Sequence, residues 1–454
     1  MVTRARPGVG RLAITLIVAL IVIIGGVATY AYLATETASN STTTTTSTST
    51  TNPQVETPTP TFQNGSCGTG PAYADSWLLF KHDSERTGFS SYNFSTSSAG
   101  RFLGQLAWRN SSGFSEMAAS QSELFVASYW LYALNLTNGK GLWTETTGAG
   151  PAPPIAADGN TVYLGENVGP PTAFNATTGA NSQIGDTMTL ATVAICGDVA
   201  YINSGPGPGE FQNGPPTDSL QALNLTSGHD LWTLDLASGF FNGYYPTTDG
   251  HMVYMLMDNG TVFAYSAASG TLVWRQTIPL VPVTTVTTST GSNHSVTLVE
   301  NPNAADDFVE APPLSGGKLF VTTTFGMMYA LNATTGSVVW STDLGTNITD
   351  ARGSSAMGYG KIFEGTAAGL LAVNATDGSI VWNVPLNSTD TGTPTVVDGY
   401  VFVADFSGTL YQFNASNGAF LWSYTGLGEG YVSEPIVADG FVAVDGNHGV
   451  FAFR

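Results

Sequence analysis

The chain has 454 residues and a formal charge of −20, yet only 10% of its residues are charged. Its 53 glycines suit many short strands joined by tight turns and do not suit a helical bundle. The excess of 33 acidic over 13 basic residues argues against nucleic acid or anionic lipid as a partner, because their phosphates are bound by Lys and Arg.

The N-terminal residues predict a membrane anchor. Residues 12–34 carry no charge and are numerous enough to span the hydrocarbon core as a single helix. Arg4, Arg6 and Arg11 precede this run, which predicts that residues 1–11 are cytoplasmic and that the rest of the chain lies outside the cell. A cleaved signal peptide is the alternative, although its apolar core is typically only about 7–15 residues long.

A Ser/Thr-rich segment follows at residues 35–70, and its composition cannot bury a core. We expect it to form an extended stalk between the membrane and a segment at residues 71–98, which precedes a run of repeats. The two cysteines, Cys67 and Cys196, could pair in an oxidising compartment and would then tie the stalk to the third repeat unit. The alternative is two unrelated buried thiols.

Residues 99–454 are self-similar. The clearest copies are LYALNLTNGKGLW (131–143), LQALNLTSGHDLW (220–232), VFAYSAASGTLVW (262–274), MYALNATTGSVVW (328–340), LLAVNATDGSIVW (370–382) and LYQFNASNGAFLW (410–422). Each unit predicts four short antiparallel strands, and such sheets bury both faces only when they stack around an axis. The pattern therefore predicts an all-β propeller.

The ends of the chain predict how the ring closes. The last unit stops one strand short, at residue 454, while residues 104–110 (GQLAWRN) form an orphan strand of the missing type. The outer-strand positions are then Trp108, Trp143, Ser182, Trp232, Trp274, Trp340, Trp382 and Trp422. Eight such positions predict eight blades, with a polar insertion at residues 276–310.

The repeat resembles the tryptophan-docking repeat of the quinoprotein (PQQ-like) propellers, and DSWLLFKHDSERTGFSS (75–91) resembles the segment that often precedes their first blade. The resemblance implies that the tryptophans are structural, each packing against the neighbouring blade. This family usually has Asp where the present chain has Asn within N-x-[ST] sequons. We expect N-glycosylation or turn capping at Asn135, Asn175, Asn224, Asn332, Asn374 and Asn414, and glycosylation also at Asn259.

The dehydrogenases of this family imply a test for a cofactor. They hold the quinone PQQ with vicinal cysteines or basic residues and a stacking aromatic, and they bind calcium with acidic and amide side chains. The present chain has no adjacent cysteines, no Trp on a predicted inner strand and few basic residues. No cofactor is therefore predicted, and PQQ with calcium remains the alternative.

The loops at one mouth of the channel supply a candidate ligand face. Its residues are Phe241, Tyr244, Tyr245, Asp350, Arg352, Glu429, Tyr431 and Glu434. Aromatic side chains beside acids suit a carbohydrate or a peptide, so a surface protein or a carbohydrate is the expected partner. Asp405 and Asp445 occupy hairpin turns in which acids could hold a metal cation.

The sequence favours an extracellular, membrane-tethered binding or scaffold module, comparable to the propellers of this superfamily that hold assembly partners and carry no cofactor. No catalytic motif supports an enzyme. A PQQ-dependent sugar or alcohol dehydrogenase is the alternative.

Overall fold

The computed structural model describes Cys67 and residues 80–83, 85–94, 102–111, 116–120, 122–147, 154–165, 171–184, 191–204, 218–236, 245–257, 260–279, 308, 311–345, 354–388 and 390–454. The regular elements in these ranges are all strands. Within them, no helix has the length and hydropathy that crossing a bilayer requires. The predicted anchor at residues 12–34 lies outside the described residues.

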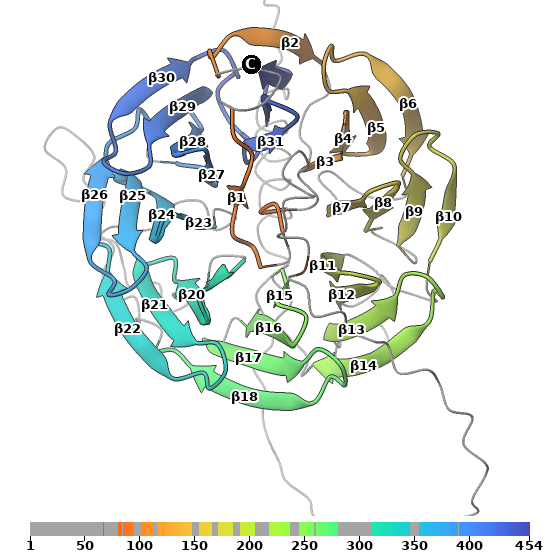
Figure 1. Cartoon of the computed structure of the whole chain (residues 1–454), viewed down its shortest axis with the longest axis vertical. Coiled ribbons are helices and arrows are strands. Elements are labelled where there is room, and N and C mark those ends of the chain that lie inside the picture. Colours follow the sequence, from red (N-terminus) through yellow and green to blue (C-terminus); the bar gives the residue numbers. More distant parts are fainter. Residues whose placement is uncertain are drawn as a thin grey trace, which may run out of the picture. The chain divides into compact units, whose positions relative to one another are not determined.

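Eight sheets surround a common axis (Figure 1), so the predicted eight-bladed propeller is confirmed. Their strand pairs are antiparallel except for the parallel pair of β1 and β27. Blade 1 comprises β3 (Glu116–Ser120), β4 (Glu123–Ala127), β5 (Trp130–Asn135) and β6 (Gly141–Thr146). Blade 2 comprises β7 (Ile155–Asp158), β8 (Thr161–Leu164), β9 (Thr172–Asn175) and β10 (Asn181–Gln183). Blade 3 comprises β11 (Ala191–Cys196), β12 (Val199–Ser204), β13 (Asp218–Asn224) and β14 (Asp230–Leu236). Blade 4 comprises β15 (Thr247–Thr248), β16 (Met252–Met257), β17 (Thr261–Ser266) and β18 (Leu272–Thr277).

The second half of the ring repeats this plan. Blade 5 comprises β19 (Leu314–Ser315), β20 (Lys318–Thr322), β21 (Met327–Asn332) and β22 (Val338–Asp343). Blade 6 comprises β23 (Ala356–Gly358), β24 (Lys361–Thr366), β25 (Gly369–Asn374) and β26 (Ile380–Val384). Blade 7 comprises β1 (Phe89–Ser90), β27 (Thr395–Val397), β28 (Tyr400–Asp405), β29 (Thr409–Asn414) and β30 (Phe420–Tyr424). Blade 8 comprises β31 (Ile436–Ala438), β32 (Phe441–Gly446), β33 (Gly449–Phe453) and β2 (Leu106–Asn110).

The two ends of the propeller join in blade 8. Strand β2 pairs antiparallel with β33, and Trp108 lies opposite Ala452. The backbones of Gln105 and Arg454 exchange hydrogen bonds of 3.0 and 2.9 Å next to this pair. The orphan strand predicted at residues 104–110 therefore completes the last blade.

The core lies between the blades. The second and third strands of a blade contact neighbouring sheets on both faces. Their sequences are therefore continuous apolar runs, without the alternation of apolar and polar residues that a half-exposed strand shows. Strand β12 is buried along its whole length, whereas β6, on the rim, alternates between exposed and half-buried residues. The outermost strands therefore form the rim of the ring.

Each outer-strand tryptophan covers the turn of the following blade. A Cβ on Gly336 would lie 2.5 Å from the ring of Trp274, so only a glycine, here at φ +73°, allows the indole to approach. The Trp274 Nε1–H also donates to the carbonyl oxygen of Ala333 at 2.8 Å. The same packing joins Trp108 to Gly139, Trp143 to Gly179, Trp232 to Gly270, Trp340 to Gly378, Trp382 to Gly418 and Trp422 to Gly104.

Candidate functional site

The centre of the ring is occupied by residues 80–83 and 85–94, which we call the hub segment. Figure 1 shows its strand β1 inside the ring, and β1 pairs in parallel with β27 of blade 7. Three carbonyls of the hub segment accept hydrogen bonds of 2.6–2.9 Å from the inner strands of blades 5, 6 and 7: Leu314 N to Glu85, Met357 N to Thr87, and Val396 N to Gly88. The hub segment thus provides partners for the inner-strand edges, which would otherwise remain open.

Two fully buried cations of the hub segment bind backbone carbonyls. Lys81 Nζ donates to the carbonyl oxygens of Ser354 at 2.6 Å and Ser355 at 2.7 Å. Burial lowers the pKa of Lys81 to about 7, although nearby Glu434 and Glu364 favour its charged form. This lysine therefore fastens the hub segment to the loop before blade 6.

Arg86 extends these contacts toward blades 3 and 4. Its guanidinium donates to the carbonyl oxygens of Phe80 at 2.6 Å and Pro246 at 3.1 Å, and also to that of Val193. It lies 5.0 Å from the ring centroid of Tyr245, in cation–π geometry. Burial lowers the pKa of Arg86 to about 10, so the side chain stays charged at neutral pH.

A buried carboxyl group completes the charge cluster. Glu364, on β24, is fully buried, and its Oε2 accepts hydrogen bonds from Thr322 Oγ1 at 3.1 Å and from Ser355 Oγ. Its Oε1 has no hydrogen-bond partner within the described part of the chain. Burial raises the pKa of Glu364 to about 7, and the charge of Lys81 opposes this shift. These ionisable groups therefore hold the hub segment in place and do not face a ligand.

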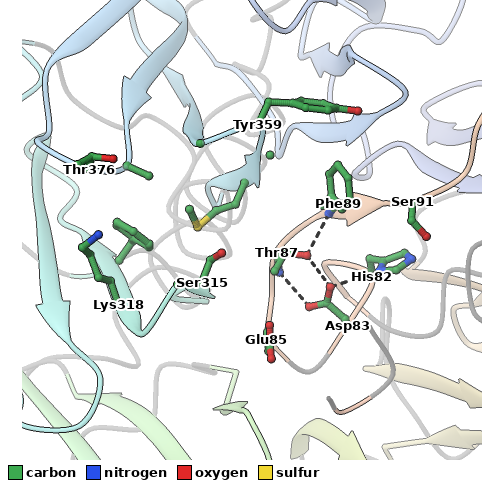
Figure 2. Close-up of a pocket in the computed structure, with 16 residues that line it drawn as sticks. His82, Asp83, Glu85, Thr87, Phe89, Ser91, Ser315, Lys318, Tyr359 and Thr376 are labelled. Atoms are coloured by element: carbon green, nitrogen blue, oxygen red, sulfur yellow. Dashed lines mark hydrogen bonds and ion pairs between the residues drawn. The ribbon is translucent and has the colours of Figure 1, made fainter. Parts of the chain in front are cut away.

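A pocket of about 420 Å³ opens between the hub segment and blades 5 and 6 (Figure 2). The hub segment forms one side of it. Lys318 and Thr376 lie on the opposite side, and Tyr359 stands at the margin. The remaining lining residues are His82, Asp83, Glu85, Thr87, Phe89, Ser91, Ser315, Gly316, Phe320, Met357, Gly358, Gly360 and Ala375.

The hub side of the pocket is acidic and internally hydrogen-bonded. Asp83 accepts hydrogen bonds from the backbone nitrogen of Thr87 at 3.0 Å and from its hydroxyl at 2.5 Å, and His82 Nδ1 lies 3.3 Å away. Burial and the charges of Asp83 and Asp249 raise the pKa of Glu85 to about 7. The Thr87 hydroxyl, which donates to Asp83 and accepts from Phe89 N, stabilises the turn of the hub segment.

The margin of the pocket is aromatic. The rings of Phe89 and Tyr359 meet edge-on, with centroids 5.7 Å apart, and Tyr359 is 51% exposed. The Tyr359 hydroxyl accepts a hydrogen bond from Gly399 N at 2.7 Å, which orients the ring. The pocket lining therefore combines an exposed aromatic ring at its margin with Lys318 and acidic side chains elsewhere, so it offers both apolar and charged surface.

The ligand face predicted from the sequence does not coincide with this pocket. Tyr245 is buried and donates its hydroxyl to Glu116 at 2.8 Å, while Glu434 accepts a hydrogen bond from Lys81 N at 3.0 Å. Glu429 is exposed and Tyr431 half-buried, away from the pocket lining. The other predicted members, Phe241, Tyr244, Asp350 and Arg352, lie outside the described residues.

The proposed metal ligands occupy hairpin turns. Asp405 is fully buried, and its carboxylate accepts hydrogen bonds from Ser388 N at 3.1 Å and from the hydroxyls of Tyr411, at 2.9 Å, and Ser407. Asp445 is likewise buried. In the described ranges no three His, Cys, Asp or Glu residues gather in a way that could hold a metal ion. Asp405 therefore acts as the cap of the β28–β29 hairpin.

The residues present do not fit a quinone with its calcium. The two cysteines are not adjacent and form a disulfide, Cys67 to Cys196, between the segment before the propeller and blade 3. The docked tryptophans lie on outer strands, and the buried cations of the hub segment already bind backbone carbonyls. No stacking indole and no vicinal pair of cysteines is therefore available in the described chain.

The sequon asparagines cap the repeat turns. Asn332 Oδ1 accepts hydrogen bonds from the backbone nitrogens of Thr334 and Thr335, at 3.0 and 2.9 Å. Equivalent bonds form at Asn135, Asn175, Asn224, Asn374 and Asn414. Asn259 lies outside the described residues. Because the cap uses the oxygen atom, it leaves Nδ2, the atom that N-glycosylation modifies, outside the turn.

Sequence reasoning missed the hub residues Lys81 and Arg86, the buried Glu364 on β24 beside them, and the adjoining pocket. The available signal was the segment at residues 75–91, which resembles the family's pre-blade segment but was assigned to a region ahead of the propeller.

Comparison with known proteins shows the family to which the chain belongs. The sequence profile of the family described as "Outer membrane protein assembly factor BamB" matches residues 216–300, 283–356 and 366–454, about half of the chain. The BamB of Moranella endobia is 26% identical over 259 residues, which cover 49% of this chain and 60% of the relative. The BamB of Yersinia pestis is 25% identical over 259 residues, covering 52% of this chain and 58% of the relative. The chain thus spans about 60% of the length of these curated relatives.

Solved structures share the fold at low sequence identity. The crystal structure of BamB from Moraxella catarrhalis superposes with a TM-score of 0.55 at 16% identity, covering 77% of this chain and 98% of that one. The quinohemoprotein alcohol dehydrogenase of Comamonas testosteroni gives a TM-score of 0.61 at 14% identity, covering 84% of this chain and 81% of that one. Since an assembly factor and an alcohol dehydrogenase share this fold, the fold alone does not show which function the chain has.

Proposed function

Because the chain belongs to the family of PQQ-like repeat propellers described as outer membrane protein assembly factor BamB, we propose that it is a binding and scaffold module without catalytic activity. In this proposal the propeller stands outside the cell, tethered by residues 12–34, and binds a polypeptide partner at the mouth of its channel.

The observation that carries the proposal is the closed centre of the ring. Lys81 and Arg86 are fully buried and bind backbone carbonyls, so these two basic side chains of the channel hold the chain itself together. Recognition is then left to the mouth, where the pocket presents Tyr359, Lys318 and Glu85. A rigid ring with one mixed apolar and charged pocket suits a partner segment that carries an apolar anchor and a charged neighbour.

Two equivalent lysines allow a controlled test. Lys318 begins β20 and lines the pocket, whereas Lys361 begins β24 in the next blade and does not line it. We expect Lys318→Glu in the full-length, membrane-tethered chain to lose at least about tenfold of the partner recovered by affinity purification after surface cross-linking. Lys361→Glu should retain that partner. Equal recovery by both variants would reject the pocket as the binding site.

The dehydrogenase alternative has its own test. The full chain would be incubated with PQQ and Ca²⁺ and supplied with alcohols and sugars together with an electron-accepting dye. The scaffold proposal expects no dye reduction above that of the protein without PQQ. Reduction that depends on PQQ would contradict it.

A further inference from the structure

One blade junction differs from the seven that are closed by tryptophans. In every blade except blade 8, which has Ala443, the third residue of the second strand is aromatic. The Trp of the outer strand packs against this residue at five junctions, with ring centroids 5.6–6.1 Å apart. In blade 2 the aromatic residue is Tyr163 on β8, and Ser182 occupies the register of the tryptophan: Tyr163 pairs with Ala173, and Ala173 with Ser182. The junction between blades 2 and 3 therefore keeps the aromatic wall and lacks the indole.

Among the residues that the structure describes, none covers the surfaces that an indole would cover at this junction. A Cβ on Gly228 would meet no atom within 4 Å, whereas the equivalent Cβ on Gly270 would lie 2.8 Å from the ring of Trp232. Tyr163 is half-buried, although its counterparts in blades 1 and 3, Phe125 and Tyr201, are completely buried. No tryptophan of the described chain covers this site.

The hydrogen-bond acceptor for an indole is also in place. At six of the seven other junctions the Nε1–H of the tryptophan donates to the carbonyl of the residue after the turn's first Asn or Ser, as Trp143 does to Ala176 at 2.6 Å. The corresponding carbonyl in blade 3 belongs to Leu225. Leu225 and Tyr163 line a small groove together with Ile184, Pro171, Ile195 and Ile202. This groove offers an apolar floor and an aromatic wall beside Leu225, the residue whose carbonyl corresponds to the one that the repeat uses for an indole.

The charges around the groove favour a ligand with basic residues beside its tryptophan. Burial raises the pKa of Tyr163, and the carboxylates of Asp158 and Asp198 add to this effect, so both acids lie near the Tyr163 hydroxyl. The chain as a whole has a charge of −20. A second copy of this chain would bring the same negative charge, whereas a segment with Lys or Arg beside its tryptophan would be attracted.

We propose that the groove between blades 2 and 3 binds a tryptophan side chain of a partner polypeptide whose neighbouring residues are basic. The partner's indole takes the place that the blade's own tryptophan takes at the other junctions. This site lies at a different junction from the pocket beside the hub segment, so its failure would leave the function proposed above intact.

The test uses the full chain and the peptide acetyl-Lys-Trp-Lys-amide, labelled with 5-fluorotryptophan and followed by ¹⁹F NMR. We expect a saturable shift with the unmodified chain and an affinity at least about tenfold lower for Ser182→Trp, which fills the groove with the chain's own indole. Ser341→Trp is the control, because it adds an exposed indole beside a junction already closed by Trp340. The peptide with Glu in place of Lys should bind several-fold more weakly, and this difference should shrink at about 1 M salt.

Several outcomes would overturn the proposal. The first is the absence of a saturable shift with the unmodified chain, which is expected if the chain's own residues close the groove. The second is equal affinity of the peptide for the unmodified chain and for Ser182→Trp. If Ser182→Trp does not fold, a diazirine-bearing tryptophan peptide on the unmodified chain decides, since labelling away from Tyr163 and Leu225 would reject the site. Self-association in sedimentation that is lost in both Ser182→Trp and Trp130→Ala would assign the groove to a second copy instead.

Discussion

At the residue scale, the ionisable groups of the hub segment are shaped by burial. Lys81 and Arg86 are completely enclosed, yet each finds carbonyl oxygens, which replace the water lost on folding. Glu85 differs because its side chain lines the pocket and its pKa is raised to about 7. The hub segment thus has two parts: buried cations that hold the ring together, and a pocket-lining carboxyl whose charge changes near neutral pH.

Glu85 makes the stability of the chain depend on pH. Its carboxyl has an ordinary pKa of 4.5 and a folded pKa of about 7, so between these values the folded chain binds more protons than the unfolded chain. The contribution of Glu85 to stability therefore falls as the pH rises from about 4.5 to about 7. The unfolding free energy of Glu85→Gln, relative to that of the parent, should rise by about 1–2 kcal/mol from pH 4.5 to pH 8. This figure allows for screening of the half-buried carboxyl by solvent. Urea unfolding at both pH values measures this gain. Exposed Glu429→Gln is the control, and an equal gain there would contradict the argument.

Asn332 tests whether the turn asparagines cap, carry glycans or do both. Asn332→Asp keeps an oxygen for the backbone nitrogens of Thr334 and Thr335 but removes the amide that a glycan needs. We expect Asn332→Asp to lose one glycan in the intact mass with little change in melting temperature. Asn332→Ala should lose the same glycan and about 1 kcal/mol of stability. An unchanged mass for both variants would reject glycosylation at this site.

At the scale of single elements, the repeat shows how far sequence reasoning reaches. The turn glycine, the asparagine and the tryptophan recur at fixed spacing, so strand order and blade count follow from local patterns, and Trp108 on an isolated strand predicted ring closure. The hub segment does not recur. Its charged run, Lys81 to Arg86, has the composition of a solvated loop, and its burial depends on carbonyls such as that of Ser354, about 270 residues away in the chain. Tyr245 and Glu434 were assigned to a surface for the same reason, because only the folded ring reveals their contacts with the hub segment.

The tryptophan contacts between blades predict a loss of stability on truncation. The ring of Trp382 packs on Gly418 and near Phe363, and its Nε1–H donates to Ala415. Trp382→Ala should lower the unfolding free energy by about 2–4 kcal/mol, because it removes a large apolar surface and leaves a cavity. Trp130, which is 46% exposed on β5, is the control, and Trp130→Ala should cost under about 1 kcal/mol. Equal losses in denaturant unfolding would contradict the structural role of Trp382.

At the scale of the whole molecule, a ring of eight blades is held by three kinds of contact. Strand β2 closes it at the rim, tryptophans join successive blades, and the hub segment ties the inner strands together. The disulfide between Cys67 and Cys196 adds a covalent tie from the preceding segment to blade 3. The low identity to both a BamB structure and a quinohemoprotein dehydrogenase leaves the choice between scaffold and enzyme to the site residues.

The central claim is that the mouth of the channel, beside the hub segment, is the surface that binds a polypeptide. It is tested most directly by a photo-cross-linking amino acid placed at position 359 in the full-length chain, in intact cell membranes. The control places the same amino acid at position 421, which is exposed on the rim strand β30. The account predicts a discrete polypeptide adduct from position 359 that is absent from position 421. No adduct at position 359, or the same adducts from both positions, would contradict it.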